Sequence, residues 1–160
     1  MKTILFVCTG NTCRSPMAEG ILKDLLKKSE HSSKEIEVRS AGISVFQKGQ
    51  ANPKSIKVTK NMDIDISDHT TQALTEELVK KADLILTMTQ SHKQQILIVQ
   101  PQVRDKVFTL LEFIQEEEKT ENMDIYDPFG LPEEEYEKTA QQLLSALKIA
   151  LPKIINKFFA

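Results

Sequence analysis

Several residue types are scarce in this sequence of 160 residues, and each scarcity excludes a class of protein. Tryptophan is absent and aromatic residues make up only 6% of the chain, which argues against a stacking platform for single-stranded nucleic acid. The 21 basic and 23 acidic residues give a net charge of −2, without the basic excess of a protein that binds a phosphate backbone. No apolar run approaches the length of a membrane span. We therefore expect neither a nucleic-acid nor a membrane partner.

Cysteine is also scarce, since only Cys8 and Cys13 are present. Two thiols are too few for a disulfide framework and, without a nearby pair of histidines, too few for a structural zinc site. The apolar run before Cys8 ends at Thr9, too early for a secretory segment. We expect a cytoplasmic protein that holds no metal and uses its thiols for catalysis or redox chemistry.

Hydrophobic residues make up 40% and charged residues 28% of the chain, an ordinary globular balance. The length favours one domain over residues 1–160, with a core that needs no disulfides. Continuous apolar runs predict buried strands at 4–7, 36–38, 82–86 and 106–109. Helices are expected to begin at the caps Ser15, Asn52, Thr75 and Ser91 and at Glu133, with Pro152 kinking or dividing the last one. Strands that alternate with helices predict a parallel α/β sheet.

The most informative stretch is Cys8-Thr9-Gly10-Asn11-Thr12-Cys13-Arg14-Ser15, between the first strand and the first helix. A short loop at this place points its backbone N–H groups inward, and the helix N-terminus adds its positive end. Gly10 and Asn11 are residue types that tolerate left-handed conformations. Arg14 can grip two phosphoryl oxygens with its planar fork. The stretch therefore predicts a phosphate-binding loop, called here the phosphate loop.

Cys8 is the candidate nucleophile of this loop. Nearby positive charge and dipoles favour the thiolate, so we expect Cys8 to be ionised at neutral pH and to form a phosphocysteine intermediate. Ser15 can donate its hydroxyl to the Cys8 sulfur, and the same residue can also serve as a helix N-cap. A small buried apolar role for Cys8 is the alternative, and the position between strand and helix argues against it.

The spacing of a cysteine, five residues, an arginine and a serine near the N-terminus resembles the signature of the low-molecular-weight protein tyrosine phosphatases. The sequence Asp127-Pro128-Phe129-Gly130 resembles the loop that carries the general acid of this family. The resemblance covers essentially the whole chain. It implies a single three-layer α/β domain with a four-stranded parallel sheet and helices on both faces. It also implies a phosphatase that acts on phosphorylated proteins without metal or cofactor; a monomer is favoured.

Asp127 is the candidate general acid and base. The leaving group needs a proton, and a carboxyl beside a thiolate and a phosphate holds its proton longer. The same carboxylate can then accept a proton from the attacking water. Asp before Pro is also common in turns, where its side chain caps its own backbone. The matching nucleophile motif favours the catalytic role.

The resemblance also assigns supporting residues. It implies a polar network of Asn11, Ser40 and His69 that holds the loop in shape, although a lone surface histidine is the simpler interpretation of His69. His31 and His92 show no signal, and the acidic run 116–118 is expected to be a solvated loop. The residues expected to contact the phosphate or the substrate are Thr9, Gly10, Asn11, Thr12, Cys13, Ser15 and Phe129.

Thr12 bears on the choice of substrate. Tyrosine phosphatases of the family commonly carry Ile at this position, whereas Thr resembles the bacterial protein-arginine phosphatases. The Thr hydroxyl can accept from a guanidinium N–H, which an apolar side chain would leave unpaired. We therefore expect a protein-arginine phosphatase. The alternatives are a neutral substitution at Thr12 and a phosphotyrosine phosphatase in which Phe129 packs on the substrate ring.

Two further classes of function are arsenate reduction and phosphoresidue binding without catalysis. Arsenate reductases share this fold and loop, but their electron relay needs more cysteines than the two present here. A non-catalytic binding protein is not expected, because the nucleophile, the arginine and the acid are all present. Redox sensitivity can coexist with activity: Cys13 could trap oxidised Cys8 as a disulfide, or it could be a small packed residue. Phe46, in the segment 44–52, is a candidate for the pocket wall or an ordinary loop residue.

Overall fold

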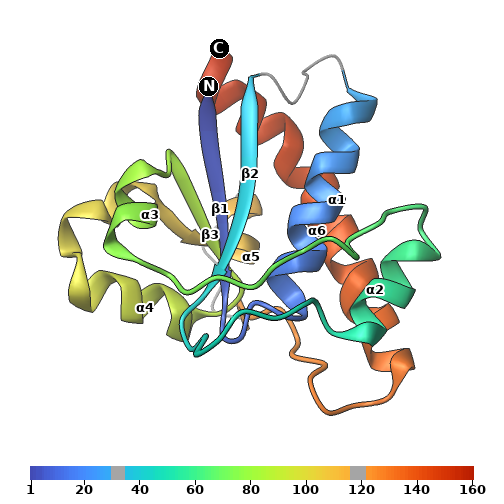
Figure 1. Ribbon diagram of the computed structural model, residues 1–160. Helices are drawn as coiled ribbons and strands as arrows, with labels where there is room; N and C mark the ends of the chain where they lie inside the picture. The colour runs from blue at the N-terminus through green and yellow to red at the C-terminus, as the bar shows by residue number, and fades with distance from the viewer. Residues whose placement is uncertain (30–34, 116–121) are drawn as a thin grey trace.

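The computed structural model describes residues 1–29, 35–115 and 122–160 (Figure 1). Its centre is a four-stranded sheet with the strand order β2-β1-β3-β4. The strands are β1 (Lys2–Cys8), β2 (Ile36–Gly42), β3 (Leu84–Thr87) and β4 (Val107–Thr109). Every pair of neighbouring strands is parallel. The expected parallel α/β sheet is confirmed.

Helices cover both faces of the sheet (Figure 1). One face packs against α1 (Arg14–Lys28), α5 (Leu110–Ile114) and α6 (Glu133–Phe159), and the other against α3 (Glu76–Lys81) and α4 (Gln90–Val99). α2 (Pro53–Lys60) packs against α1 and α6. The alternating side chains of β1 divide between two cores, since Ile4 and Phe6 point to the first face and Leu5 and Val7 to the second. This burial on both sides explains the continuous apolar run in the sequence.

Two of the expected helix caps are wrong. α1 begins at Arg14 and has no side-chain cap, because the Ser15 hydroxyl is engaged inside the loop. α4 is capped by Thr89, whose hydroxyl accepts from the backbone N–H of His92, rather than by Ser91. The caps at Asn52 and Thr75 are confirmed: the Asn52 side chain accepts from the Lys54 N–H and the Thr75 side chain from the Leu78 N–H.

The element boundaries differ from the expectation at several places. β2 extends to Gly42 because Ser40, Ala41 and Gly42 continue the register with β1. The short helix α5 and a 3₁₀ helix (Pro101–Lys106) flank β4 and were not predicted. α6 continues through Pro152 as one helix, so the chain does not divide there. His31 and the acidic run 116–118 lie outside the described residues.

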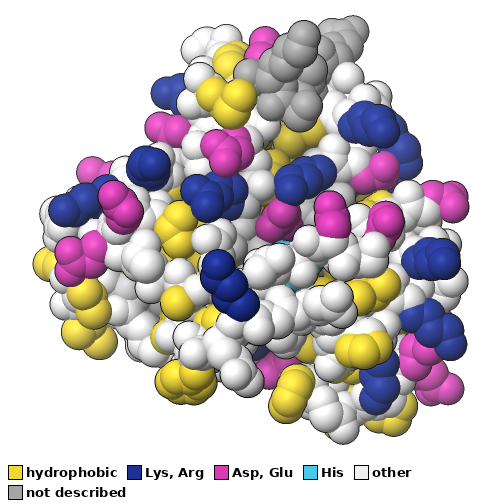
Figure 2. Space-filling view, in the orientation of Figure 1, with side chains coloured by type: hydrophobic (Ala, Val, Ile, Leu, Met, Phe, Trp, Pro, Cys, Tyr) yellow, Lys and Arg dark blue, Asp and Glu magenta, His cyan; other side chains and the backbone are white. Residues whose placement is uncertain are grey.

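The surface and the helices bear on the expected partners. On the face shown in Figure 2, basic and acidic side chains are interspersed over the described residues, so that face presents no broad patch of one charge. Among the described residues, no helix combines the length and the apolar character that a membrane crossing requires.

The fold brings the phosphate loop to the carboxyl end of the central strand β1, the edge at which open α/β sheets place their sites. Gly42, at the end of β2, lies directly beside this loop. A Cβ atom on Gly42 would lie 2.6 Å from the Thr9 carbonyl oxygen and 2.9 Å from the Asn11 nitrogen. The close approach of two backbone segments therefore requires a glycine here.

Candidate active site

Cys8 ends β1 and lies buried at the centre of the phosphate loop. Its sulfur is 2.8 Å from the Ser15 hydroxyl oxygen, and the backbone N–H of Asn11 donates to it at 3.2 Å. The Asn11 side-chain amide donates to the same Ser15 oxygen at 2.8 Å. Because that oxygen already accepts a hydrogen bond, its own hydrogen is available to the Cys8 sulfur. The geometry thus directs two donors at Sγ.

Opposing influences act on the Cys8 thiol. Burial raises the pKa of the thiol above its ordinary value, while the hydrogen bonds from Ser15, the charge of Arg14 and the N–H of Asn11 lower it. Burial is the largest of these influences. Burial, which the loop sequence does not reveal, therefore opposes the thiolate, and the ionisation of Cys8 at neutral pH stays a prediction. The surrounding donors still favour the anion once it forms.

Asn11 organises the loop from a left-handed backbone conformation, with φ of 56°. Its side-chain amide also donates to the Ser40 hydroxyl at 3.0 Å, and its side-chain oxygen accepts from the Gln72 N–H at 2.9 Å. Its carbonyl oxygen accepts from Nε2 of His69 at 2.9 Å. All its polar groups have partners, as a buried polar residue requires. Gly10, expected to share the left-handed conformation, does not have a positive φ.

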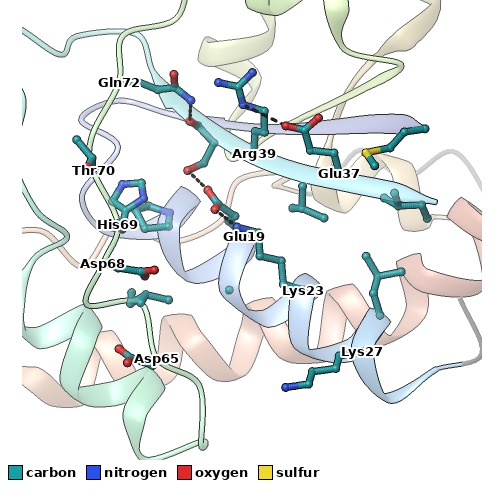
Figure 3. A pocket seen from close by; sticks show the side chains of 18 of the residues that line it. Glu19, Lys23, Lys27, Glu37, Arg39, Asp65, Asp68, His69, Thr70 and Gln72 are labelled. Atoms are coloured by element: carbon teal, nitrogen blue, oxygen red, sulfur yellow. Dashed lines mark hydrogen bonds and ion pairs between the residues drawn. The ribbon is translucent and has the colours of Figure 1, made fainter. Parts of the chain in front are cut away.

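The support for Asn11 continues outward into a groove of about 1060 Å³ between α1, β2 and the segment 65–72 (Figure 3). The Ser40 hydroxyl donates to Glu19 at 2.6 Å, and Glu19 is held in turn by Lys23 at 2.6 Å. The Gln72 side-chain amide donates to the Ser40 carbonyl oxygen at 2.9 Å. Figure 3 shows this chain of contacts at one end of the groove, so the loop is stabilised from behind by α1, β2 and the segment 65–72.

Arg14 and Asp127 come together although 113 positions separate them in the sequence. Nη2 of Arg14 lies 3.4 Å from Oδ2 of Asp127, and Nη1 donates to the Ile125 carbonyl oxygen at 3.2 Å. The arginine is buried, whereas 51% of the Asp127 side chain is exposed. Oδ1 of Asp127 accepts from the Phe129 N–H at 3.1 Å. The Asp127 carboxylate therefore accepts from the turn backbone and also faces Arg14. These contacts fit both the backbone-capping role and the role of general acid.

The remaining expected residues occupy different surroundings. Thr12 is partly buried, and its hydroxyl lies 3.6 Å from the Cys13 sulfur. Cys13 is buried beside the Tyr136 hydroxyl, at 3.5 Å, and both cysteines of the chain are free. Burial raises the pKa of Tyr136 above its ordinary value, so the phenol is protonated and can donate. Phe129 is 68% exposed, and Phe46 projects into solvent.

The geometry is that of an anion-binding loop with a buried thiol, a buried arginine and an accessible carboxylate, and comparison with known proteins names its family. The model of the family described as low molecular weight phosphotyrosine protein phosphatase matches residues 3–157. The chain belongs to this phosphatase family. The resemblance indicated by the two sequence motifs is confirmed.

Individual relatives of this phosphatase differ in the substrate that their names give. A protein-arginine-phosphatase of Bacillus subtilis is 41% identical over 145 residues, which cover 91% of each chain. The "Probable low molecular weight protein-tyrosine-phosphatase EpsP" of Ralstonia nicotianae is 36% identical over 154 residues, covering 96% of this chain and 97% of its own. The crystal structure of a YwlE mutant from Bacillus subtilis has a TM-score of 0.87 at 37% identity, covering 96% of this chain and 99% of that one.

The phosphatase site includes residues that the sequence analysis did not identify. Glu19 and Gln72 support the loop through Ser40 and Asn11. Glu19 stands four residues after Ser15, on the same face of α1, and this spacing is the signal that could have identified it. Gln72 acts largely through its backbone N–H, for which no sequence pattern exists.

His92 is the third residue of the site that the sequence analysis did not identify. Nε2 of His92 lies 2.9 Å from the Thr9 hydroxyl oxygen, and the ring is buried. Burial, with a smaller contribution from the charge of Arg14, lowers the pKa of His92 to about 4, although Asp124 and Asp127 act in the opposite direction. The imidazole is therefore neutral near pH 7.

The described residues offer no cluster of metal ligands. Within residues 1–29, 35–115 and 122–160, no group of three or more His, Cys, Asp or Glu side chains is arranged to hold a metal ion. The groups that would neutralise a bound phosphate are instead Arg14, the donors of the loop and the N-terminus of α1.

Proposed function

We propose that the protein hydrolyses phosphoarginine side chains of proteins, with Cys8 as nucleophile and Asp127 as general acid and base. The observation on which this specificity rests is Thr12 within the phosphate loop. Its carbonyl oxygen accepts from the Asn52 N–H at 2.8 Å, so the start of α2 fixes its backbone. Its hydroxyl can then accept from a guanidinium N–H. The 41% identity to a protein-arginine-phosphatase supports the same choice.

In the first step, the Cys8 thiol loses its proton to solvent and the thiolate attacks phosphorus. A sulfur–phosphorus bond forms while the phosphorus–nitrogen bond breaks, and its electron pair goes to the guanidino nitrogen. Asp127 gives that nitrogen a proton, as its exposed position near Arg14 allows. Arg14 and the loop N–H groups bind the phosphoryl oxygens and stabilise their charge in the transition state. The unmodified arginine side chain of the substrate protein and phosphocysteine are the products.

In the second step, water attacks phosphorus and the sulfur–phosphorus bond breaks. The Asp127 carboxylate takes a proton from the water, which restores the carboxyl for the next cycle. The electron pair of the broken bond returns to the Cys8 sulfur. The Ser15 hydroxyl and the Asn11 N–H donate to this sulfur and stabilise it as the leaving group. The chain thus has a group for the proton of the leaving nitrogen and of the attacking water, and donors for the charge on the phosphoryl oxygens and on the sulfur.

A phosphotyrosine phosphatase is the second candidate, and one observation favours it. Phe129 is 68% exposed next to Asp127, where its ring could pack on the ring of a phosphotyrosine. The identity to EpsP is consistent with this alternative. Both candidates use the same nucleophile, arginine and acid, so only the leaving-group side of the site distinguishes them.

The test compares three forms of Thr12 on a phosphoarginine peptide, with Cys8→Ala as the blank. Thr12→Ile removes the acceptor and is expected to lower kcat/KM by roughly 10- to 100-fold, the effect of leaving a cationic N–H unpaired. Thr12→Ser keeps the hydroxyl and is the matched control, expected to lose much less. If Thr12→Ile hydrolyses the peptide as well as Thr12→Ser does, Thr12 does not select phosphoarginine.

A further inference from the structure

Thr9 is an exposed residue that directly follows the nucleophile, and its side chain contacts the helix α4. Its hydroxyl oxygen lies 2.9 Å from Nε2 of His92 on α4. The His92 side chain is itself held, because the residue is only 4% exposed and its backbone N–H donates to Thr89 at 3.1 Å. The loop is therefore anchored to α4 as well as by the Asn11 network.

The position of the imidazole hydrogen follows from the second ring nitrogen. Nδ1 of His92 is buried and has no hydrogen-bond partner among the described residues. In a neutral imidazole one nitrogen carries the hydrogen and the other is an acceptor. A buried N–H without an acceptor is rarer than an unused acceptor, so we assign the hydrogen to Nε2. Nε2–H therefore donates to the Thr9 oxygen.

Neutrality of the ring agrees with its surroundings. Burial and the charge of Arg14 lower the pKa of His92, and Asp124 and Asp127 compensate only in part. Two of these charged groups, Arg14 and Asp127, belong to the site, although His92 has no role in the mechanism proposed above.

We propose that His92 is a positioning residue that holds the Thr9 hydroxyl so that its hydrogen points to a phosphoryl oxygen of the substrate. The Thr9 oxygen accepts from His92, which leaves its own hydrogen free to donate. A guanidinium has only donors and cannot accept this hydrogen, whereas a phosphoryl oxygen can. The inference rests on the proposed phosphatase function, because it assigns a further phosphate donor to the same site.

The first experiment measures the binding of inorganic phosphate to the intact protein by calorimetry, which requires no turnover. Thr9→Val has nearly the same shape as threonine but no hydroxyl, and it is expected to weaken phosphate binding by roughly ten-fold. Thr9→Ser is the matched control and should bind phosphate more tightly than Thr9→Val. Phosphate affinity that is unchanged in Thr9→Val would overturn the proposal, as would a loss confined to the KM for phosphoarginine.

The second experiment separates positioning from general support. His92→Gln can place an amide N–H near the position of Nε2, whereas His92→Asn cannot reach Thr9, so only His92→Asn should weaken phosphate binding strongly. If His92 acts through Thr9, adding His92→Asn to Thr9→Val changes phosphate affinity no further. Additive losses in the double variant would overturn the proposal, provided that thermal unfolding shows each variant to be folded.

The outcomes also distinguish this inference from the proposed function. A wild-type protein that hydrolyses phosphoarginine but shows no effect of Thr9→Val on phosphate binding retains its function and refutes the role of His92. If the wild-type protein hydrolyses neither phosphopeptide but Thr9→Val weakens phosphate binding, the proposed function is refuted and the role of Thr9 as a phosphate donor stands.

Discussion

Replacement of Ser15 by alanine tests the hydrogen-bond direction on which the second catalytic step depends. The Ser15 oxygen accepts from the Asn11 amide at 2.8 Å, so its hydrogen is directed to the Cys8 sulfur, also at 2.8 Å. During hydrolysis of the intermediate this sulfur regains negative charge. A hydrogen bond to a charged group contributes about 1.5–3 kcal/mol, so Ser15→Ala should slow the second step by roughly 10- to 150-fold.

The substitution should slow the first step less than the second, because in the first step the sulfur is the attacking group and loses its charge. Loss of the Ser15 donor also raises the pKa of the Cys8 thiol further, since the hydrogen bonds from Ser15 now lower it. The net expectation is that phosphocysteine accumulates and that product release shows a burst in rapid-mixing experiments. The measurement follows the release of the dephosphorylated peptide within the first turnover.

The control for Ser15→Ala is Ser15→Thr, which keeps a hydroxyl on the same backbone position. A Ser15→Ala variant that turns over at the wild-type rate would refute the assigned direction. Equal slowing of both steps, without a burst, would equally show that Ser15 supports the shape of the loop and does not stabilise the leaving sulfur.

Three further predictions concern the fold around the site. Gly42→Ala would place a methyl group 2.6 Å from the Thr9 carbonyl oxygen, so activity should fall together with the thermal midpoint, and an unchanged midpoint would contradict the close approach. His92 takes up a proton below about pH 6.5 in the unfolded chain but only near pH 4 in the folded protein, so the free energy of unfolding should drop by about 3 kcal/mol as the pH falls between these values. Chemical denaturation of His92→Gln should show that this variant has lost much of the pH dependence. Peroxide is expected to join Cys8 and Cys13 in a disulfide, and mass spectrometry that finds over-oxidised Cys8 with free Cys13 would refute the pairing.

The sequence was sufficient where a structural feature depends on local pattern. The run Ile4 to Val7 predicts a strand buried on both faces, and the structure divides its side chains between two cores. The cysteine-to-arginine spacing predicts the loop because the thiol, the backbone donors and the arginine lie within eight consecutive residues. The Asp-Pro motif identifies Asp127 by its resemblance to the family, although nothing local places it beside Arg14.

The sequence was insufficient where tertiary contacts decide. Ser15 is a residue type that often caps helices, but its hydroxyl is hydrogen-bonded to Asn11 and Cys8. The helix α1 therefore begins one residue earlier, at Arg14. The Gln72 N–H reaches Asn11 from 61 residues away, and no pattern in the chain encodes that contact. His92 showed no signal because its relevance arises from burial against Thr9.

The desolvation of Cys8 also depends on tertiary contacts that the sequence does not reveal. Motif reasoning counts the donors and charges around a thiol, and these favour the thiolate. The burial that opposes them depends on the packing of the whole sheet edge, and it is the larger influence on the pKa of Cys8. Ionisation of the nucleophile is therefore a property of the fold and cannot be read from the loop sequence.

The central claim is that the site prefers phosphoarginine to phosphotyrosine, and a competition assay tests it most directly. Two peptides that differ only in the phosphorylated residue are mixed at equal concentration with the wild-type protein, and the initial rates of their dephosphorylation are measured in one vessel by mass spectrometry. Their ratio gives the ratio of the two kcat/KM values. The account predicts that the phosphoarginine peptide is consumed first and that Cys8→Ala consumes neither. Faster loss of the phosphotyrosine peptide would contradict it.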